Sequence, residues 1–271
     1  MANPDHLEVA RLGAGAVATW RELHPNLSLD LSGADLSGGD LGGADLRNAD
    51  FRQANLHDIK FGQSDLRGAN LSDTNLSRAG LSEANLNGAD LSRANLRGAN
   101  LTEADLGNAT VSGANFRGAN LRAADLRGAD LSNANLSQTS LGDARLGAAN
   151  LDGANLGQAN LSGTSFAQAN LRGANLANAD MFKADLSGVN LTGADLSRAE
   201  LGQADLRGAD LSGANLSGAG FKWAVLFGEG TGTVRGLTAA QMRSASSYTG
   251  AVLPPSVQAE LDRTEPAATS P

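Results

Sequence analysis

Apolar side chains recur at every fifth position of this chain from residue 31 to residue 226. All 40 of these positions are apolar, and 33 of them are leucine. A second column of small residues lies two positions earlier and is alanine at 32 of 40 positions. The position between the two columns is asparagine at 16 places and aspartate at 15. The repeating unit is therefore Ala-[Asn/Asp]-Leu-x-x, and a fixed period of this kind indicates a repeat architecture.

A five-residue period fits neither an α-helix nor a flat strand, which repeat near 3.6 and 2 residues. It fits a chain that turns a corner every five residues. The alanine and the leucine lie two positions apart, so they point to one side of a short extended segment, and the Asn/Asp and the x-x pair point outward. The x-x pair, often Ser-Gly or Arg-Gly, predicts the turn, because glycine tolerates the backbone angles that a corner needs. We expect the whole apolar column to be buried.

The units resemble those of the pentapeptide-repeat proteins, as residues 34–38 (Ala-Asp-Leu-Ser-Gly) and 94–98 (Ala-Asn-Leu-Arg-Gly) illustrate. The resemblance covers about 200 of the 271 residues, in one unbroken frame. It implies an all-β fold, a right-handed quadrilateral parallel β-helix with four units per coil and leucine and alanine stacked inside. Forty units would make about ten coils, roughly 48 Å long at the spacing of about 4.8 Å between strands.

The repeat divides the chain into four predicted segments. Residues 1–25 are expected to form an N-terminal capping helix, residues 26–228 the β-helix, residues 229–263 a C-terminal helical cap and residues 264–271 a disordered tail. Such caps would cover coil edges that otherwise expose unpaired backbone groups. The N-terminal helix is expected to bury one apolar face made of Val9, Leu12, Ala16, Trp20 and Leu23.

Two short helices are predicted in the C-terminal cap. Thr238 and Gln241 have the spacing of a capping box, which predicts a helix from residue 239 to about residue 246. The pair Pro254 and Pro255 is suited to open a second short helix that reaches Leu261.

Candidate chemistry is sparse. The chain has no cysteine, and its three histidines, His6, His24 and His57, are too scattered for a metal cluster. No catalytic or phosphate-loop motif is present. The sequence therefore predicts no enzyme, no cofactor and no metal site. No apolar run reaches the length of a membrane span and no signal peptide is recognisable, so we expect no membrane contact and a cytoplasmic, prokaryotic protein.

Sorting the Asn/Asp column by twenty-residue coils gives each wall of the tube its own character. One wall carries asparagine at every coil from Asn55 to Asn175, which predicts a ladder of side-chain amides. A neighbouring wall is an acidic face, and arginines two residues after four of its aspartates predict partial neutralisation in place. The six aspartates are Asp45, Asp65, Asp105, Asp125, Asp185 and Asp205; the four arginines are Arg47, Arg67, Arg127 and Arg207.

Charge bears on function. The net charge is −8, and residues 26–228 contribute −6, which argues against direct nucleic-acid binding. We predict a rigid, non-enzymatic scaffold for protein–protein interaction with an unspecified partner, in which a homodimer is possible. The resemblance also implies an alternative, because some family members are acidic tubes that mimic duplex DNA, bind a type II topoisomerase (DNA gyrase) and protect it from quinolones. Interleaved basic residues and the absence of projecting loops weigh against this alternative.

A candidate interaction patch lies near the C-terminal end of the repeat. Its large aromatic residues break the small or polar pattern of the outward columns, and two lysines flank them: Phe182, Lys183, Lys222, Trp223 and Phe227. Aromatic residues beside cations are common anchors of protein interfaces. Two interpretations stay open. Either the C-terminal segment covers the patch through Met242 or Leu253, or the patch contacts a second copy or another protein.

Overall fold

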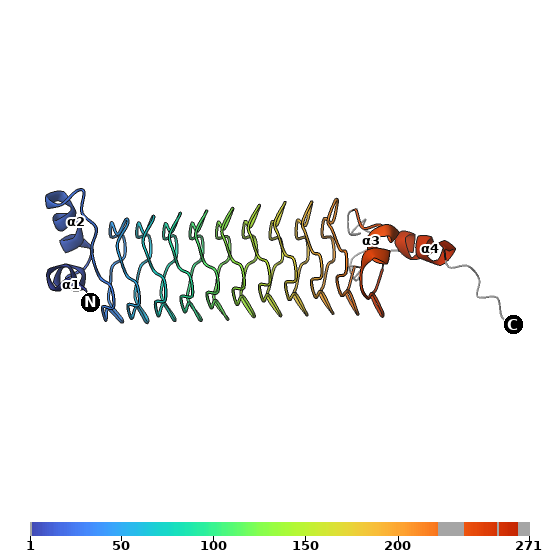
Figure 1. Cartoon of the computed structure of the whole chain (residues 1–271), viewed down its shortest axis with the longest axis horizontal. Helices are drawn as coiled ribbons and strands as arrows, with labels where there is room; N and C mark the ends of the chain where they lie inside the picture. Colours follow the sequence, from blue (N-terminus) through green and yellow to red (C-terminus); the bar gives the residue numbers. More distant parts are fainter. Residues whose placement is uncertain (1, 222–235, 254, 265–271) are drawn as a thin grey trace, which may run out of the picture.

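The structure, a computed structural model, describes residues 2–221, 236–253 and 255–264. The repeat forms a straight tube with short helices at both ends (Figure 1). Helices α1 (Pro4–Arg11) and α2 (Ala14–Leu23) lie at one end, and α3 (Ala239–Ser244) and α4 (Pro255–Thr264) lie at the other.

Coils of twenty residues build the tube. Every bridge from Asp30↔Asp50 to Glu200↔Gly220 is parallel and joins residues twenty apart, so four five-residue units make one coil. Each bridge is a single residue long, and the described residues contain no longer strand. The walls of the predicted β-helix therefore consist of isolated β-bridges rather than continuous β-strands. The turn in each unit leaves only one residue extended enough to pair with the next coil.

The apolar column fills the interior as predicted. All 39 of its positions from residue 31 to residue 221 are buried, and the most exposed, Leu36, is 5% exposed. The fortieth, Leu226, lies outside the described residues. Four hydroxyl side chains also lie inside, in the alanine column, and each donates a hydrogen bond of 2.6–2.7 Å to a backbone carbonyl: Ser64, Thr74, Thr139 and Thr164. Pairing of this kind removes most of the cost of burying a polar group.

The role of the Asn/Asp column is to pair a backbone amide that the coils leave free. In each unit, the NH groups of the leucine and of the second x residue donate to the following coil, the NH of the Asn/Asp donates to the preceding coil, and the alanine NH usually closes the turn. The NH of the first x residue has no partner in this scheme. It donates to the Asn/Asp side chain two residues earlier, as from Arg127 to Asp125 Oδ1 at 3.1 Å. This contact recurs at all 31 asparagines and aspartates of the column, from Asp30 to Asn215.

The second x residue of each unit has a left-handed backbone conformation. From residue 33 to residue 218, φ is positive at all 38 of these positions, and 21 of them are not glycine. Most turn types that require positive φ favour glycine or asparagine there, because a Cβ atom crowds the backbone. The inter-coil hydrogen bonds on both sides hold glutamine, arginine and alanine in the same conformation.

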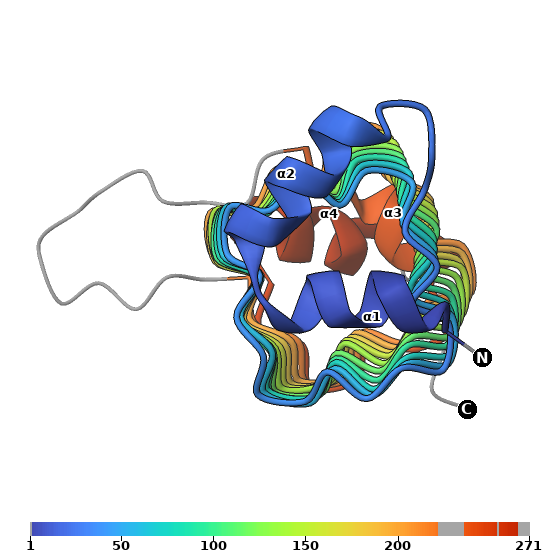
Figure 2. The same cartoon turned by 90° about the vertical axis from the view of Figure 1, so that its left-hand side faces the viewer.

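The N-terminal cap consists of two helices where the sequence predicted one. Gly13 ends the first helix with φ +90°, and an added Cβ would lie 3.3 Å from the carbonyl oxygen of Asp40. The break rotates the second helix, so the predicted apolar face is wrong in part: Leu12 and Leu23 are each 72% exposed, whereas Val17 and Trp20 are buried. Seen along the axis, α1 and α2 lie across the mouth of the tube (Figure 2).

Side chains and backbone of the N-terminal cap pair with the edge of the first coils. The guanidinium of Arg21 donates to the carbonyl oxygens of Asp45, Leu27 and Arg47 at 3.1, 2.5 and 2.6 Å. The backbone NH of Asn3 donates to the carbonyl of Asp30, and the NH of Asp30 donates to Nδ1 of His6. These contacts take the place of the coil that would otherwise precede, which is the covering role expected of the cap.

The C-terminal end contains both predicted helices and an additional piece of coil. The capping box of Thr238 and Gln241 is present at the start of α3, and α4 packs against α3. Between them, Ser247 bridges Asn215 and Val252 bridges Gly220, so the offset is 32 residues rather than 20. Residues 246–253 therefore return to the wall of the tube in a shifted frame. Gly250 takes the positive φ of the turn, and Leu253 is buried at the leucine position.

Replacing a strained turn residue by glycine should stabilise the tube. Ala148 is exposed and has φ +56°. We expect Ala148→Gly to raise the free energy of unfolding by about 0.5–1 kcal/mol, since the relief of left-handed strain exceeds the entropy gained by the unfolded chain. Denaturant unfolding of the purified protein measures this.

Ala149→Gly is the matched control one residue further on. Ala149 is 1% exposed, its φ is not positive, and its methyl packs inside the tube. Its removal should lower the free energy of unfolding by about 1 kcal/mol or more. Equal destabilisation by both variants would contradict the account of the turn.

Candidate functional site

The outer walls are the candidate functional site, since the interior is closed by packed side chains. We name two walls by their Asn/Asp columns. The amide wall contains Asn55, Asn75, Asn95, Asn115, Asn135, Asn155 and Asn175; the Asp wall contains the six aspartates of the predicted acidic face.

The amide wall carries the predicted ladder of side-chain hydrogen bonds in part, at three of the six steps between Asn55 and Asn175. Nδ2 of Asn75 donates to Oδ1 of Asn55 at 3.0 Å, and Nδ2 of Asn175 donates to Oδ1 of Asn155 at 3.1 Å. Each of these Oδ1 atoms also accepts the backbone NH two residues on. Where the ladder forms, it fixes the orientation of the amides.

The Asp wall is largely neutralised by its own arginines. Nε of Arg67 lies 2.8 Å from Oδ1 of Asp65, and its second guanidinium nitrogen contacts Oδ2, so the pair is bidentate. The same geometry recurs where the sequence predicted it, in the pairs Asp45–Arg47, Asp125–Arg127 and Asp205–Arg207. Planar forks of this kind are the strong form of the ion pair. Asp105 and Asp185 instead accept backbone NH groups.

These pairs keep the aspartates ionised. Hydrogen bonds from Arg47, Arg67 and Arg127 hold the pKa of Asp45, Asp65 and Asp125 below the usual range, against an opposing effect of partial burial. Neighbouring coils add to the network, because Nε of Arg47 lies 3.6 Å from Asp65 and Arg145 lies 3.7 Å from Asp125.

The structure describes only part of the predicted aromatic patch. Phe182 is half-buried, and Nζ of Lys183 lies 5.2 Å from the centre of its ring. Lys222, Trp223 and Phe227 lie outside the described residues. Met242 and Leu253 are the residues through which the C-terminal segment was expected to cover the patch. Both are buried in the C-terminal cap. The patch therefore stays a prediction.

A recess on the amide wall was not predicted from the sequence. Arg117 stands at one end, and the side walls are two parallel rows of amides, Asn155 and Asn175 on one side and Gln138, Gln158 and Asn178 on the other. The floor is low because the first x residues of successive coils are small, namely Ser137, Gly157 and Ala177. That run of small residues one coil apart, directly after Arg117 in the same column, is the signal that sequence reasoning could have used.

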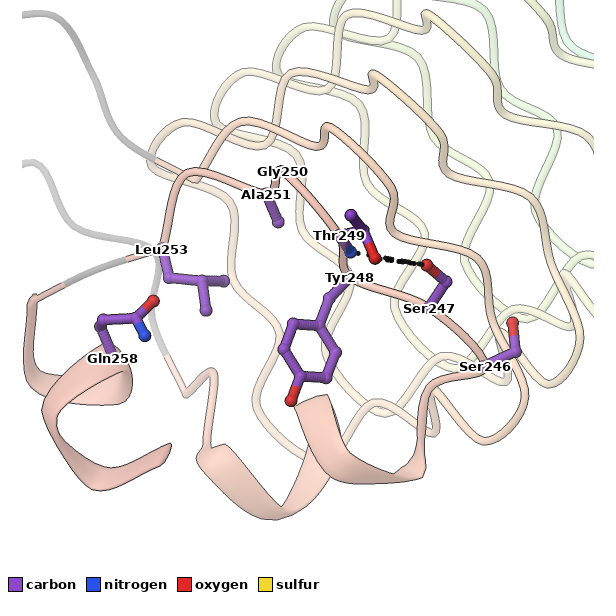
Figure 3. Close-up of a pocket in the computed structure, with 8 residues that line it drawn as sticks. All are labelled: Ser246, Ser247, Tyr248, Thr249, Gly250, Ala251, Leu253 and Gln258. Carbon is purple, nitrogen blue, oxygen red and sulfur yellow. Dashed lines mark hydrogen bonds between the residues drawn. The ribbon is translucent and has the colours of Figure 1, made fainter. Parts of the chain in front are cut away.

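A second hollow lies at the C-terminal end of the tube (Figure 3). It is lined by residues 246–251, Leu253 and Gln258, and the ring of Tyr248 lies among these side chains. Tyr248 occupies a leucine position of the shifted frame yet is 36% exposed, because no further coil of the described residues covers it. The lining holds hydroxyl groups and an amide and no carboxylate or cation, so it offers no charged group for acid–base or metal chemistry.

Two properties of the described residues limit the chemistry. They contain no group of three or more histidine, aspartate or glutamate side chains that could hold a metal ion. None of the helices among residues 2–221, 236–253 and 255–264 is long and apolar enough to cross a bilayer.

Comparison with solved structures finds several repeat proteins. HetL, a pentapeptide repeat protein involved in heterocyst differentiation regulation from Nostoc sp. strain PCC 7120, is 35% identical over 74% of this chain and 94% of its own, with a TM-score of 0.30. Rfr23 from Cyanothece 51142 is 40% identical over 39% of this chain and 62% of its own, with a TM-score of 0.26. QnrB1, a plasmid-mediated fluoroquinolone resistance protein, is 21% identical over 87% and 92%, with a TM-score of 0.41.

A comparison with curated proteins gave no match. The family model described as "Pentapeptide repeats" matches residues 30–68, 59–98, 99–138, 149–188 and 184–222, which together make up more than half of the chain. Its tube of parallel coils is a β-helix solenoid, and the chain belongs to the pentapeptide repeat family.

Proposed function

We propose that this protein is a rigid, non-enzymatic scaffold that binds other proteins through the walls of its tube. The observation that carries the proposal is the repeated pairing of the backbone. Because the Asn/Asp side chain pairs the one amide that the coils leave free, each unit presents its outward side chains at fixed positions one coil apart. A preorganised surface of this kind loses little conformational entropy when it binds.

Mimicry of duplex DNA, the alternative, receives less support from the surface. A mimic needs an extended surface of unpaired negative charge to compete for a site that binds phosphates. Here four of the six aspartates of the Asp wall are held in bidentate pairs with arginine. Binding to DNA gyrase therefore stays the second candidate. A cytoplasmic location and a homodimer are likewise predictions.

The charge pairing of the Asp wall can be tested by its dependence on pH. The folded pKa values of Asp45, Asp65 and Asp125 are lowered, chiefly by hydrogen bonds from arginine. These groups therefore stabilise the fold fully above the unfolded pKa of about 3.9, and the stabilisation is lost as the pH falls through the lower folded values. We expect the Tm to be nearly constant between about pH 7 and 5 and to fall below about pH 4.

The double variant Arg67→Gln/Arg127→Gln identifies the source of that dependence. It removes two pairs, so its Tm should lie below that of the parent at neutral pH, and the difference should shrink as the aspartates of the parent become protonated. Thermal unfolding followed by circular dichroism at a series of pH values measures both proteins. A Tm difference that stays constant down to about pH 2 would show that the pairs contribute no charge-dependent stability.

Partner binding can be tested with a photo-crosslinking amino acid at one exposed corner of each wall. Asn133, Asp143, Ala148 and Gln158 are matched for this purpose, because all four are exposed and share the same positive φ. We expect reproducible protein adducts from one or two of these corners in cells of the source organism, since a scaffold contacts its partner through particular walls. No adduct, or the same adducts from all four corners, would contradict the scaffold proposal.

A supercoiling assay with purified gyrase and the full-length protein separates the two candidates. The scaffold proposal predicts unchanged supercoiling activity and unchanged quinolone sensitivity. Inhibition of supercoiling or protection from the drug would favour the alternative.

A further inference from the structure

Three arginines of the tube differ from the others in having no acidic partner. Between residues 26 and 221 there are thirteen arginines. Ten lie within 4.0 Å of an aspartate oxygen. Among the described residues, no carboxylate lies within that distance of the remaining three, Arg97, Arg117 and Arg198. All three belong to the amide wall, so this wall carries unpaired positive charge on a molecule of net charge −8.

Two of these arginines bracket the recess of the amide wall. Arg117 lines one end, where Nε donates to Oε1 of Gln138 at 3.2 Å. Arg198 occupies the same column as Asn178, one coil beyond the other end. The nearby carboxylate of Asp195 accepts hydrogen bonds from the NH of Ser197 and from Asn215 instead.

The recess between them contains donors and acceptors but no acidic group. Nε2 of Gln138 donates to Oε1 of Gln158 at 3.1 Å, which orders one row of amides, and the bond from Asn175 to Asn155 orders the other. No carboxylate lines the recess. The hollow on the adjacent wall is different, because its Arg122 lies 3.6 Å from its own Asp143. Of these two recesses, only the one on the amide wall is lined by a cation that no carboxylate neutralises.

We propose that this recess binds an extended acidic segment of a partner protein, with one carboxylate at Arg117 and another at Arg198. Four coils separate the two arginines, a distance of about 19 Å at a spacing of about 4.8 Å per coil. An extended peptide rises about 3.3 Å per residue, so acidic residues about six positions apart would reach both. The amide rows between them offer donors and acceptors, which a peptide backbone matches.

A nucleic-acid strand fits the same surface less well. Strands without sequence preference are usually held by aromatic side chains on which the bases stack. On the amide wall, the outward-facing positions between residues 75 and 198, which surround the recess, hold no aromatic residue. A strand carries a negative charge at every nucleotide, whereas the proposed segment needs only two carboxylates, so the excess of negative charge on the other walls repels the strand more strongly. The proposal rests on the scaffold function and names the wall and the partner chemistry.

The test uses fluorescence anisotropy with the full-length protein and three labelled ten-residue peptides. The first has glutamate at positions 2 and 8 and serine elsewhere, the second has glutamate at positions 2 and 4, and the third has glutamine at positions 2 and 8. We expect the first peptide to bind with a Kd below about 1 mM and at least about tenfold more tightly than either of the others. A poly-dT decanucleotide is measured in parallel.

Matched variants locate the binding. Arg117→Gln/Arg198→Gln should weaken binding of the first peptide at least about tenfold, whereas Arg122→Gln, on the adjacent wall, should leave it unchanged. Each variant should keep a cooperative melting transition, because the replaced side chains are on the surface. Equal weakening by Arg122→Gln, equal binding of all three peptides, or tighter binding of the oligonucleotide would overturn the proposal. Wall-specific crosslinks at a corner other than Gln158 would remove this site while leaving the scaffold function in place.

Discussion

One short hydrogen bond underlies this architecture, from the backbone NH of the first residue after leucine to the Asn/Asp side chain two positions earlier. A buried or half-buried amide without a partner costs about 1–3 kcal/mol. The remaining NH groups of a unit are usually paired by backbone carbonyls of the same or a neighbouring coil. The NH of the first x residue therefore decides whether all backbone NH groups of the unit are hydrogen-bonded. The side-chain oxygen of an asparagine or aspartate reaches this NH, as in the turns that these residues favour elsewhere. Backbone hydrogen bonding therefore explains why the Asn/Asp column is present. Any binding role of the surface that it forms is additional.

The same pairing explains how the tube tolerates its turns. A left-handed residue other than glycine costs roughly 1–3 kcal/mol unless its surroundings fix it. Here Gln158 and Ala148 adopt that conformation because hydrogen bonds to the following coil and the pairing of the neighbouring NH leave few alternatives. Strain is thus distributed over many units. Because neighbouring coils pair each other's backbone, each end of the tube needs a cap to pair its last backbone groups. Arg21 does this at one end and residues 246–253 at the other.

Much of the fold follows from the sequence, because the period of five decides which side chains face inward and the resemblance to the family implies four units per coil. Burial of the apolar column and pairing on the Asp wall could both be read from spacing, since Arg67 is fixed two residues from Asp65. The N-terminal break could not, because it depends on the φ of Gly13 against the carbonyl of Asp40. The unit around Tyr248 was missed because residues 222–235 separate it from the frame, and the bridges of Ser247 to Asn215 and of Val252 to Gly220 reveal it. The recess at Arg117 is built from side chains of four successive coils, which a one-unit pattern does not display.

Native-state hydrogen exchange at two serines tests the central claim most directly. Ser162 and Ser82 occupy the same corner of different coils, and both are half-buried. The NH of Ser162 donates to Oδ1 of Asn160 at 3.0 Å. Ser82 lies two residues after Gly80, which has no side chain to accept a hydrogen bond from the Ser82 NH. The account predicts that the amide of Ser162 exchanges at least about tenfold more slowly than that of Ser82, as a bond worth about 1.4 kcal/mol requires. Equal protection of the two amides would contradict it.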